Sequence, residues 1–222
     1  MDHTRHSEIY DLKNMGVSLI GAGGIGAITG ISIAKMGIGW IVIYDDDKVD
    51  DVNIPVQFHK YSDIGRNKAY ALEDTICKFT DMLNETVVPF ASRVDENTDL
   101  YGDVIISAVD SIAARKNIWQ AVKNFKDRYY LDARMSAQEF HLYCVDLKDE
   151  KMVEHYDTII NSEDDESISD EPCTAKATTF TSLFAAGHIA NALKRISRAD
   201  ENQPFHIIHL IRFDELYVDR WK

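Results

Sequence analysis

Residues 17–45 read VSLIGAGGIGAITGISIAKMGIGWIVIYD. The apolar run 17–20 leads into a glycine-rich segment, residues 21–26, after which apolar residues recur at helical spacing. A second apolar run, residues 40–44, ends at Asp45. This order predicts a strand, a glycine loop, a helix and a second strand, which is the opening of a doubly wound α/β sheet.

The rest of the chain continues the alternation of helical and extended patterns. The pattern predicts helices over 65–79, 112–125 and 178–196, strands over 86–90, 103–108, 129–132 and 140–146, and one or two closing strands within 205–221. We therefore expect residues 1–222 to form a single α/β domain. Its sheet should be Rossmann-like and doubly wound, with a parallel N-terminal half and a mixed C-terminal half.

One segment departs from this composition. Residues 162–171 (SEDDESISDE) hold six acidic residues in ten and no aromatic residue. Such a segment cannot bury apolar area, so it is predicted to be a flexible acidic loop.

Composition excludes several classes of protein. The 222 residues include 24 Lys and Arg against 37 Asp and Glu, giving a formal charge of −13, which argues against nucleic acid as a partner. The longest apolar runs are far shorter than the roughly 20 residues of a membrane helix, and the N-terminus has no apolar signal region. Three widely spaced cysteines form neither a disulfide framework nor a zinc motif, so we expect a cytoplasmic protein without structural zinc.

The glycine loop predicts a nucleotide site. Gly21, Gly23, Gly24 and Gly26 would let backbone N–H groups approach a pyrophosphate at the start of a helix. Asp45, at the end of the second strand, stands where an acid binds ribose hydroxyls. A tight structural turn is the alternative, and the loop by itself would also suit a nicotinamide-dependent dehydrogenase.

The motifs that follow are unusual for a dehydrogenase. They are, in order, Asp45-x-Asp47, Asn53-x-x-x-Gln57, Gly65-x-x-Lys68 and Asp110 after a strand. Together with the glycine loop they resemble the adenylation domain of the ThiF/MoeB/HesA superfamily, over about residues 16–195. The resemblance implies that the glycine loop, Asp45, Asp47, Asn53 and Gln57 bind ATP. It also implies that Lys68 neutralises phosphate and that Asp110 holds Mg²⁺.

Each of these residues has a simpler alternative role. Asp110 could cap the helix that starts near Ser111. Lys68 could be a solvated lysine, although its charge at a helix start opposes the dipole and favours an anionic partner. Asn53 and Gln57 could be turn residues.

The chain departs from the family pattern at the residue before Gln57. The family usually has an arginine there that contacts phosphate, and this chain has Val56. The family's N-terminal arginine segment is also short here, with only Arg5 available. We hypothesise that Arg134, which follows a strand, supplies the missing charge, with a plain structural arginine as the alternative.

Cys173 follows the acidic segment in Glu171-Pro-Cys-Thr174. This arrangement is similar to the catalytic-cysteine region of ubiquitin-activating members, in which the thiolate forms a thioester. A thiol before a helix has a lowered pKa, whereas acidic neighbours raise it. A packed or capping cysteine therefore remains the alternative.

The resemblance implies an adenylyltransferase that uses ATP and Mg²⁺ on the C-terminal carboxyl of a small ubiquitin-like or sulfur-carrier protein, with possible transfer to Cys173. It also implies a homodimer. Three alternatives stay open: a non-catalytic partner subunit, a nicotinamide-dependent oxidoreductase and a tRNA-modifying dehydratase, the last disfavoured by the acidic charge.

Overall fold

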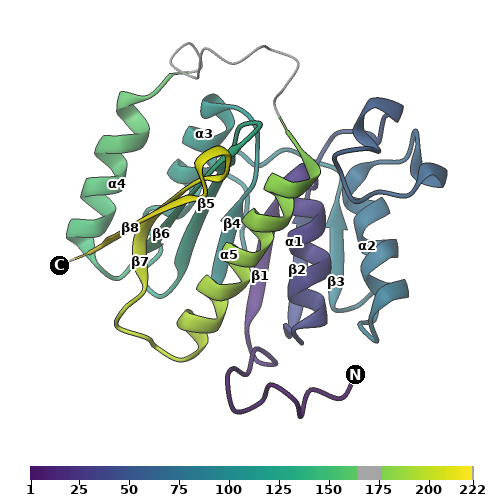
Figure 1. Cartoon of the computed structure of the whole chain (residues 1–222), viewed down its shortest axis with the longest axis horizontal. Coiled ribbons are helices and arrows are strands. Elements are labelled where there is room, and N and C mark those ends of the chain that lie inside the picture. Colours follow the sequence, from purple (N-terminus) through teal and green to yellow (C-terminus); the bar gives the residue numbers. More distant parts are fainter. Residues whose placement is uncertain (165–176, 222) are drawn as a thin grey trace.

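The structure is a computed structural model that describes residues 1–164 and 177–221. Within those residues, one eight-stranded sheet has the strand order β3-β2-β1-β4-β5-β6-β7-β8 (Figure 1). The strands are β1 Gly16–Ile20, β2 Trp40–Tyr44, β3 Val87–Phe90, β4 Val104–Ser107, β5 Tyr129–Met135, β6 Glu139–Asp146, β7 Pro204–Leu210 and β8 Glu215–Arg220. The α-helices are α1 Gly24–Lys35, α2 Lys68–Phe79, α3 Ile112–Val122, α4 Glu150–Ser162 and α5 Thr179–Ser197.

The predicted division of the sheet into a parallel N-terminal half and a mixed C-terminal half is confirmed. Strands β1 to β5 pair in parallel, and β6, β7 and β8 add to β5 as an antiparallel meander. Strands β1 and β4 are apolar along most of their length and wholly buried, which suits central strands covered on both faces.

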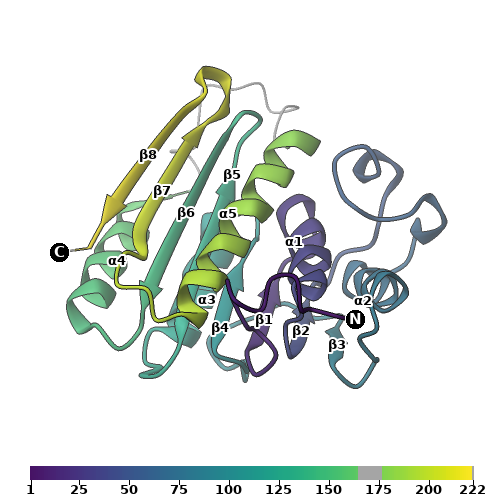
Figure 2. The same ribbon diagram turned by 60° about the horizontal axis from the view of Figure 1, so that its bottom comes forward.

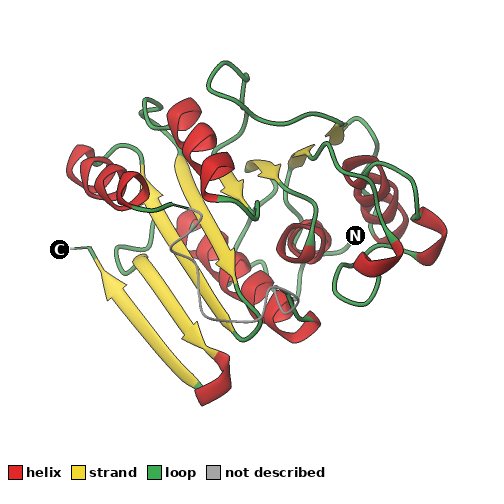
Figure 3. Ribbon diagram, turned by 90° about the horizontal axis from the view of Figure 1, so that it is seen from above, coloured by secondary structure: helices red, strands yellow, loops and turns green. Residues whose placement is uncertain are grey.

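Helices cover both faces of the sheet. Apolar side chains of α1, α2 and α5 pack on one face, and those of α3 and α4 pack on the other. Figure 2 shows α1 and α5 lying side by side over the first face. Because β1, β2, β4 and β5 pair in parallel, their carboxyl ends meet at one edge of the sheet, which Figure 3 shows from above.

Several element boundaries differ from those predicted. The second helix starts at Lys68, three residues later than Gly65, because the Asn67 side chain caps it. Strand β5 runs on to Met135, three residues beyond the predicted end at Asp132. The tail contains two closing strands, within the predicted one or two.

Helix α4 was not predicted. Its buried residues are Met152, Tyr156 and Ile160, a single narrow stripe at four-residue spacing within an otherwise polar sequence. Ser162, placed in the acidic loop by the sequence, is the last residue of α4, and residues 165–171 of that loop lie outside the described residues.

No helix in the described part of the chain is both long and apolar enough to span a bilayer.

Candidate functional site

The glycine loop connects β1 to α1. Packing requires a glycine at some of its positions and not at others. Gly21 has φ +94°, and a Cβ on Gly26 would stand 1.8 Å from the Gly21 carbonyl oxygen. Both glycines are therefore required by the packing of the loop itself. A Cβ on Gly23 would meet only the Gln57 amide, at 3.7 Å. Packing within the protein therefore does not require a glycine at position 23, and the space beside Gly23 is open.

Gly23 is also the N-cap of α1 and offers no side chain to the first-turn N–H groups. Those groups and the positive end of the helix dipole favour an anion at this point. A Cβ on Gly24 would stand 3.0 Å from the Met135 methyl group, so the end of β5 closes this side of the loop.

Asp45 follows β2 and is bound to the glycine loop. Its carboxylate accepts hydrogen bonds from the backbone N–H of Ala22 at 2.7 Å and of Asp47 at 2.9 Å. Burial is the largest influence on this carboxyl group and raises its pKa, and the two backbone donors oppose that rise. One acid therefore connects the end of β2 to the loop that follows β1.

Lys68 and Asp47 form an ion pair, with 2.9 Å between Nζ and Oδ2. The Lys68 side chain is only 9% exposed, whereas that of Asp47 is 61% exposed. Asn67 donates to the carbonyls of both Asp45 and Asp47, which fixes the start of α2 against the end of β2. Lys68 is thus a buried cation beside Asp45, and not the solvated lysine of the alternative interpretation.

The segment after Asp47 brings the Asn53 and Gln57 motif toward the loop. Gln57 lies next to Gly23, and its Oε1 atom is buried without a hydrogen-bond partner among the described residues. The Asn53 side chain accepts from the Asp50 N–H, which is the turn role. Thr179, at the start of α5, donates to the Pro55 carbonyl and ties the segment down.

His59 is a site residue that the sequence analysis missed. It is buried, and its ring Nε2 lies 2.8 Å from the Ala22 carbonyl oxygen. Because a carbonyl only accepts, Nε2 carries the proton and Nδ1 is an acceptor, which is buried and unpartnered among the described residues. Burial lowers the pKa of His59. In the sequence, only its place two residues after Gln57 could have indicated that His59 belongs to the candidate site.

Asp110 follows β4 and is exposed. The helix cap that it could have supplied comes instead from Ser111, whose Oγ accepts the Ala114 N–H. Arg93, after β3, adds a cation to this edge: it binds Asp46 at 2.8 Å, and the carboxylates of Asp46, Asp47 and Asp110 raise its pKa. Arg93 was also missed by the sequence analysis.

An exposed carboxylate such as Asp110 suits Mg²⁺, which takes one or two carboxylates together with phosphate oxygens. Asp45, Asp46 and Asp47 also have carboxylate oxygens within 4.8 Å of one another. Each of those three already binds a protein partner, so Asp110 fits the ion better.

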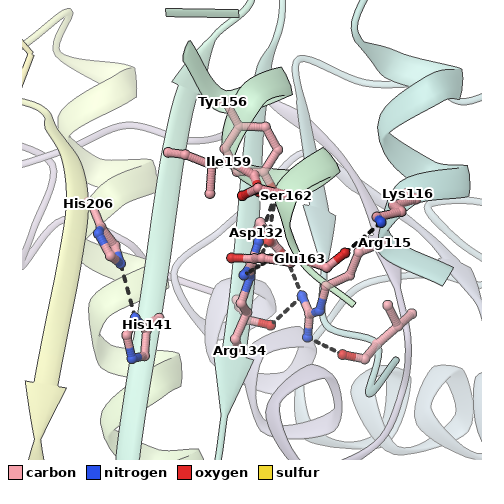
Figure 4. Close-up of polar contacts among 12 residues, drawn as sticks. Arg115, Lys116, Asp132, Arg134, His141, Tyr156, Ile159, Ser162, Glu163 and His206 are labelled. Atoms are coloured by element: carbon pink, nitrogen blue, oxygen red, sulfur yellow. Dashed lines mark hydrogen bonds and ion pairs between the residues drawn. The ribbon is translucent and has the colours of Figure 1, made fainter. Parts of the chain in front are cut away.

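Arg134 lies at the end of β5 but faces away from the glycine loop. Its guanidinium binds Asp132 and Glu163, each at 2.6 Å, on the face covered by α4 (Figure 4). The next residue, Met135, is the one that faces Gly24. That Arg134 supplies charge to ATP phosphates stays a prediction, and Cys173 lies outside the described residues.

Comparison with known proteins identifies the family. The chain matches the ThiF family over residues 2–221. It is 36% identical over 124 residues to a probable adenylyltransferase/sulfurtransferase MoeZ of Mycobacterium tuberculosis, covering 51% of this chain and 32% of that protein. It is 26% identical over 202 residues to the ubiquitin-like modifier-activating enzyme 5 of Drosophila grimshawi, covering 82% of this chain and 50% of that enzyme.

Solved structures agree on the fold. MccB of E. coli, crystallised with AMPCPP and SeMet MccA, superimposes with a TM-score of 0.69 at 19% identity, covering 94% of this chain and 64% of that one. PaaA superimposes with a TM-score of 0.72 at 18% identity, with the same coverage. The chain thus spans a third to a half of the length of these two curated relatives. The chain belongs to the ThiF family.

Proposed function

We propose that this ThiF-family chain adenylates the C-terminal carboxyl group of a small ubiquitin-like or sulfur-carrier protein, with ATP as the donor. The observation that carries the proposal is that hydrogen bonds bring the glycine loop, Asp45 and the start of α2 together at one edge of the sheet. Asp45 accepts from Ala22 of the glycine loop, and Asn67 and Lys68 at the start of α2 bind the segment 45–47. The named activity of MoeZ-type relatives and of a molybdopterin-synthase adenylyltransferase, 30% identical over 134 residues, supports the same reaction.

In this reaction a carboxylate oxygen of the protein substrate attacks the α-phosphorus of ATP. The bond from that phosphorus to the bridging oxygen breaks, and pyrophosphate leaves with the electron pair. The first-turn N–H groups of α1 would hold phosphate oxygens, and Asp45 would hold ribose hydroxyls. Lys68 would stabilise negative charge on the phosphates from its buried position.

Asp110 would hold Mg²⁺, which when bound neutralises charge that gathers on pyrophosphate. Asp47, Asn53 and Gln57 are proposed as further nucleotide contacts. For Gln57 this role is favoured by its position beside Gly23 and by its Oε1 atom, which is buried without a partner among the described residues. For Asn53 the role is less favoured, because its side chain already accepts a hydrogen bond from the Asp50 N–H.

We propose a second step after adenylation. The Cys173 thiolate would attack the acyl carbon of the acyl-adenylate and AMP would leave, giving a thioester. We also propose that the chain acts as a homodimer in the cytoplasm, on the resemblance and the cysteine pattern alone.

A non-catalytic partner subunit is the second candidate, because Val56 replaces the family arginine. In the structure its backbone carbonyl lies near Gly24, and Arg93 is the added cation on the same sheet edge. A nicotinamide-dependent oxidoreductase would share Gly23 and Asp45 but gives no reason for Lys68 and Asp110.

Thermal unfolding with Mg-ATP, Mg-ADP and NAD tests the proposal on the natural chain and on Asp110→Ala. A nucleotide at 100 times its dissociation constant adds about 2.7 kcal/mol of stability. We expect stabilisation by Mg-ATP that weakens in Asp110→Ala, with pyrophosphate exchange in the natural chain. Stabilisation by NAD alone would contradict adenylation, and binding of ATP without exchange would favour the partner subunit.

A further inference from the structure

Ala22, in the middle of the glycine loop, is held at both ends by side chains from other segments. Its backbone N–H donates to the Asp45 carboxylate at 2.7 Å, and its carbonyl oxygen lies 2.8 Å from Nε2 of His59. Ala22 is wholly buried, and His59 is only 7% exposed. Asp45 follows β2, and His59 lies 37 residues beyond Ala22 in the chain. Two segments outside the glycine loop therefore fix its backbone.

The Ala22 carbonyl and the Gly23 N–H belong to one peptide group. That peptide bond is trans, so its C=O and N–H point in opposite directions. Because His59 binds the carbonyl, the Gly23 N–H points away from His59. None of the described residues accepts a hydrogen bond from this N–H. The donor that His59 orients therefore stands beside the open space at Gly23, at the start of α1, where an anion is favoured.

The glycine after Ala22 makes this orientation easy to lose. Turning the peptide group over changes ψ of Ala22 and φ of Gly23, and a residue without a Cβ accepts positive and negative φ about equally. The turned peptide would direct the Ala22 carbonyl oxygen, the negative end of its dipole, toward phosphate oxygens. The hydrogen bond from His59 opposes that turn, because a buried N–H would lose its acceptor.

His59 donates this hydrogen bond as a neutral ring. Burial is the largest influence on its pKa and lowers it, and the charge of Lys68 acts in the same direction. The Ala22 carbonyl and the Asp63 carboxylate oppose that fall, and Asp63 is itself paired with Arg66 at 2.7 Å. A neutral ring with its proton on Nε2 keeps one donor on the Ala22 carbonyl at neutral pH.

We infer that His59 is a positioning residue for the nucleotide, because through the Ala22 carbonyl it aims the Gly23 N–H at a phosphate oxygen of ATP. The inference rests on the proposed function, in which nucleotide phosphates occupy the space beside Gly23. His59 is buried behind the loop and acts through the backbone. Loss of its donor should therefore weaken ATP binding while the fold remains.

The test compares His59→Gln with His59→Met. These two side chains have nearly the same length and volume, but only glutamine offers an N–H donor at the place of Nε2. His59→Asn is a second variant without that donor, because its shorter amide reaches only the place of Nδ1. Thr75→Val is the control for a change at a buried polar side chain elsewhere. Thr75 lies within α2, is 4% exposed, and its hydroxyl has no partner among the described residues.

Two measurements follow the nucleotide and the N–H that it meets. Isothermal titration calorimetry gives the affinity for Mg-ATP, and melting temperatures show that each variant is folded. Labelling with ¹⁵N-glycine gives an NMR spectrum of eleven glycines, in which the Gly23 signal is assigned by its loss in Gly23→Ala. A new hydrogen bond from Gly23 to a phosphate moves its amide proton downfield.

We expect His59→Met and His59→Asn to bind Mg-ATP about tenfold more weakly than the natural chain, as for one lost hydrogen bond. His59→Gln and Thr75→Val should bind close to normally. Mg-ATP should move the Gly23 amide signal in the natural chain and in His59→Gln, and less in His59→Met. Equal affinities in His59→Gln and His59→Met, or a Gly23 signal that Mg-ATP leaves in place in the natural chain, would overturn the inference.

Pyrophosphate exchange on the same samples reports on the proposed function separately. Binding of Mg-ATP that depends on the His59 donor, without exchange in the natural chain, would support the positioning role and overturn adenylation. Exchange with the same KM for ATP in the natural chain and in His59→Met would overturn the positioning role and leave adenylation standing.

Discussion

The ammonium group of Lys68 lies 2.9 Å from the carboxylate of Asp47, although Lys68 is buried and opens helix α2. A positive charge at a helix N-terminus opposes the dipole, so a buried lysine there needs an anion. Asp47 is mostly exposed and belongs to the loop after β2. The ion pair thus holds a cation beside Asp45 without closing it off from a more highly charged ligand.

Replacing Lys68 should therefore affect nucleotide binding more than folding of the helix. Lys68→Met keeps the aliphatic chain, and we expect it to weaken Mg-ATP binding about tenfold or more, as for a lost charged hydrogen bond. Isothermal titration calorimetry measures this directly. Lys78→Met is the control, because Lys78 is 65% exposed on the same helix and pairs with Asp74. Equal losses in the two variants would contradict a role for Lys68 at the nucleotide.

Substitutions at two glycines of the loop should affect different properties: Gly23→Ala should affect nucleotide binding, and Gly26→Ala should affect the stability of the fold. Gly23→Ala places a methyl group in open space beside Gln57, so we expect a melting temperature within about 3 °C of the natural chain. The same methyl group should obstruct the approach of phosphates and lower Mg-ATP affinity at least about tenfold. Gly26→Ala should instead destabilise the fold, because its Cβ would meet the Gly21 carbonyl oxygen at 1.8 Å.

Differential scanning fluorimetry with and without Mg-ATP distinguishes the two variants. A Gly23→Ala protein that binds Mg-ATP normally would mean that the open space at Gly23 is not used by phosphate.

The parallel half of the fold was predictable because its signals are local. Strands β1 and β2 are short apolar runs joined by a glycine loop and one helix, so 29 residues of sequence define them. Helix α4 was not predictable in the same way. Its apolar stripe of Met152, Tyr156 and Ile160 is narrow. The stripe is buried because it packs against residues that are distant in the sequence, such as Trp119 and Tyr130.

The site was predictable only as a set of residue types. The order of Asp45, Lys68 and Asp110 was visible in the sequence, but the pairing of Lys68 with Asp47 arises from folding. The same holds for His59, which hydrogen bonds to Ala22 across 37 residues. Arg134 shows the limit most clearly, because the side chain direction that separates it from the glycine loop depends on strand register.

Acid should weaken the antiparallel half of the sheet through His206. Burial, together with the charges of His141 and Arg134, lowers the pKa of His206 to about 4, while an unfolded histidine titrates near about 6.5. Between these values the unfolded chain binds a proton that the folded chain does not. Stability is therefore unaffected above about pH 6.5 and falls as the pH drops toward 4.

His206→Phe keeps the stack on Tyr143, whose ring centroid lies 3.8 Å away, and removes the titration. We expect urea unfolding to show that the variant loses about 1 kcal/mol less than the natural chain between pH 7.5 and 5.0, after allowance for partial exposure. His155→Phe, at an exposed position, is the control. An unchanged pH dependence in His206→Phe would contradict this assignment.

The last prediction concerns the three cysteines. Burial raises the pKa of Cys144 to about 12, and burial with nearby acids raises that of Cys77, so their thiolates are scarce at neutral pH. Cys144 Sγ also accepts a contact from Gln203 at 2.8 Å. Neither thiol is suited to attack an acyl-adenylate, which leaves Cys173 as the proposed nucleophile.

We therefore expect Mg-ATP and a sulfur-carrier or ubiquitin-like protein ending in glycine to give a covalent adduct that dithiothreitol cleaves. Cys173→Ser should lose the adduct, seen as intact mass, yet still release pyrophosphate, because adenylation precedes transfer. Cys144→Ser and Cys77→Ser should keep the adduct. An adduct that persists in Cys173→Ser and is still cleaved by dithiothreitol would assign the thioester to another residue. Pyrophosphate release without an adduct in the natural chain would mean that the reaction ends at the acyl-adenylate.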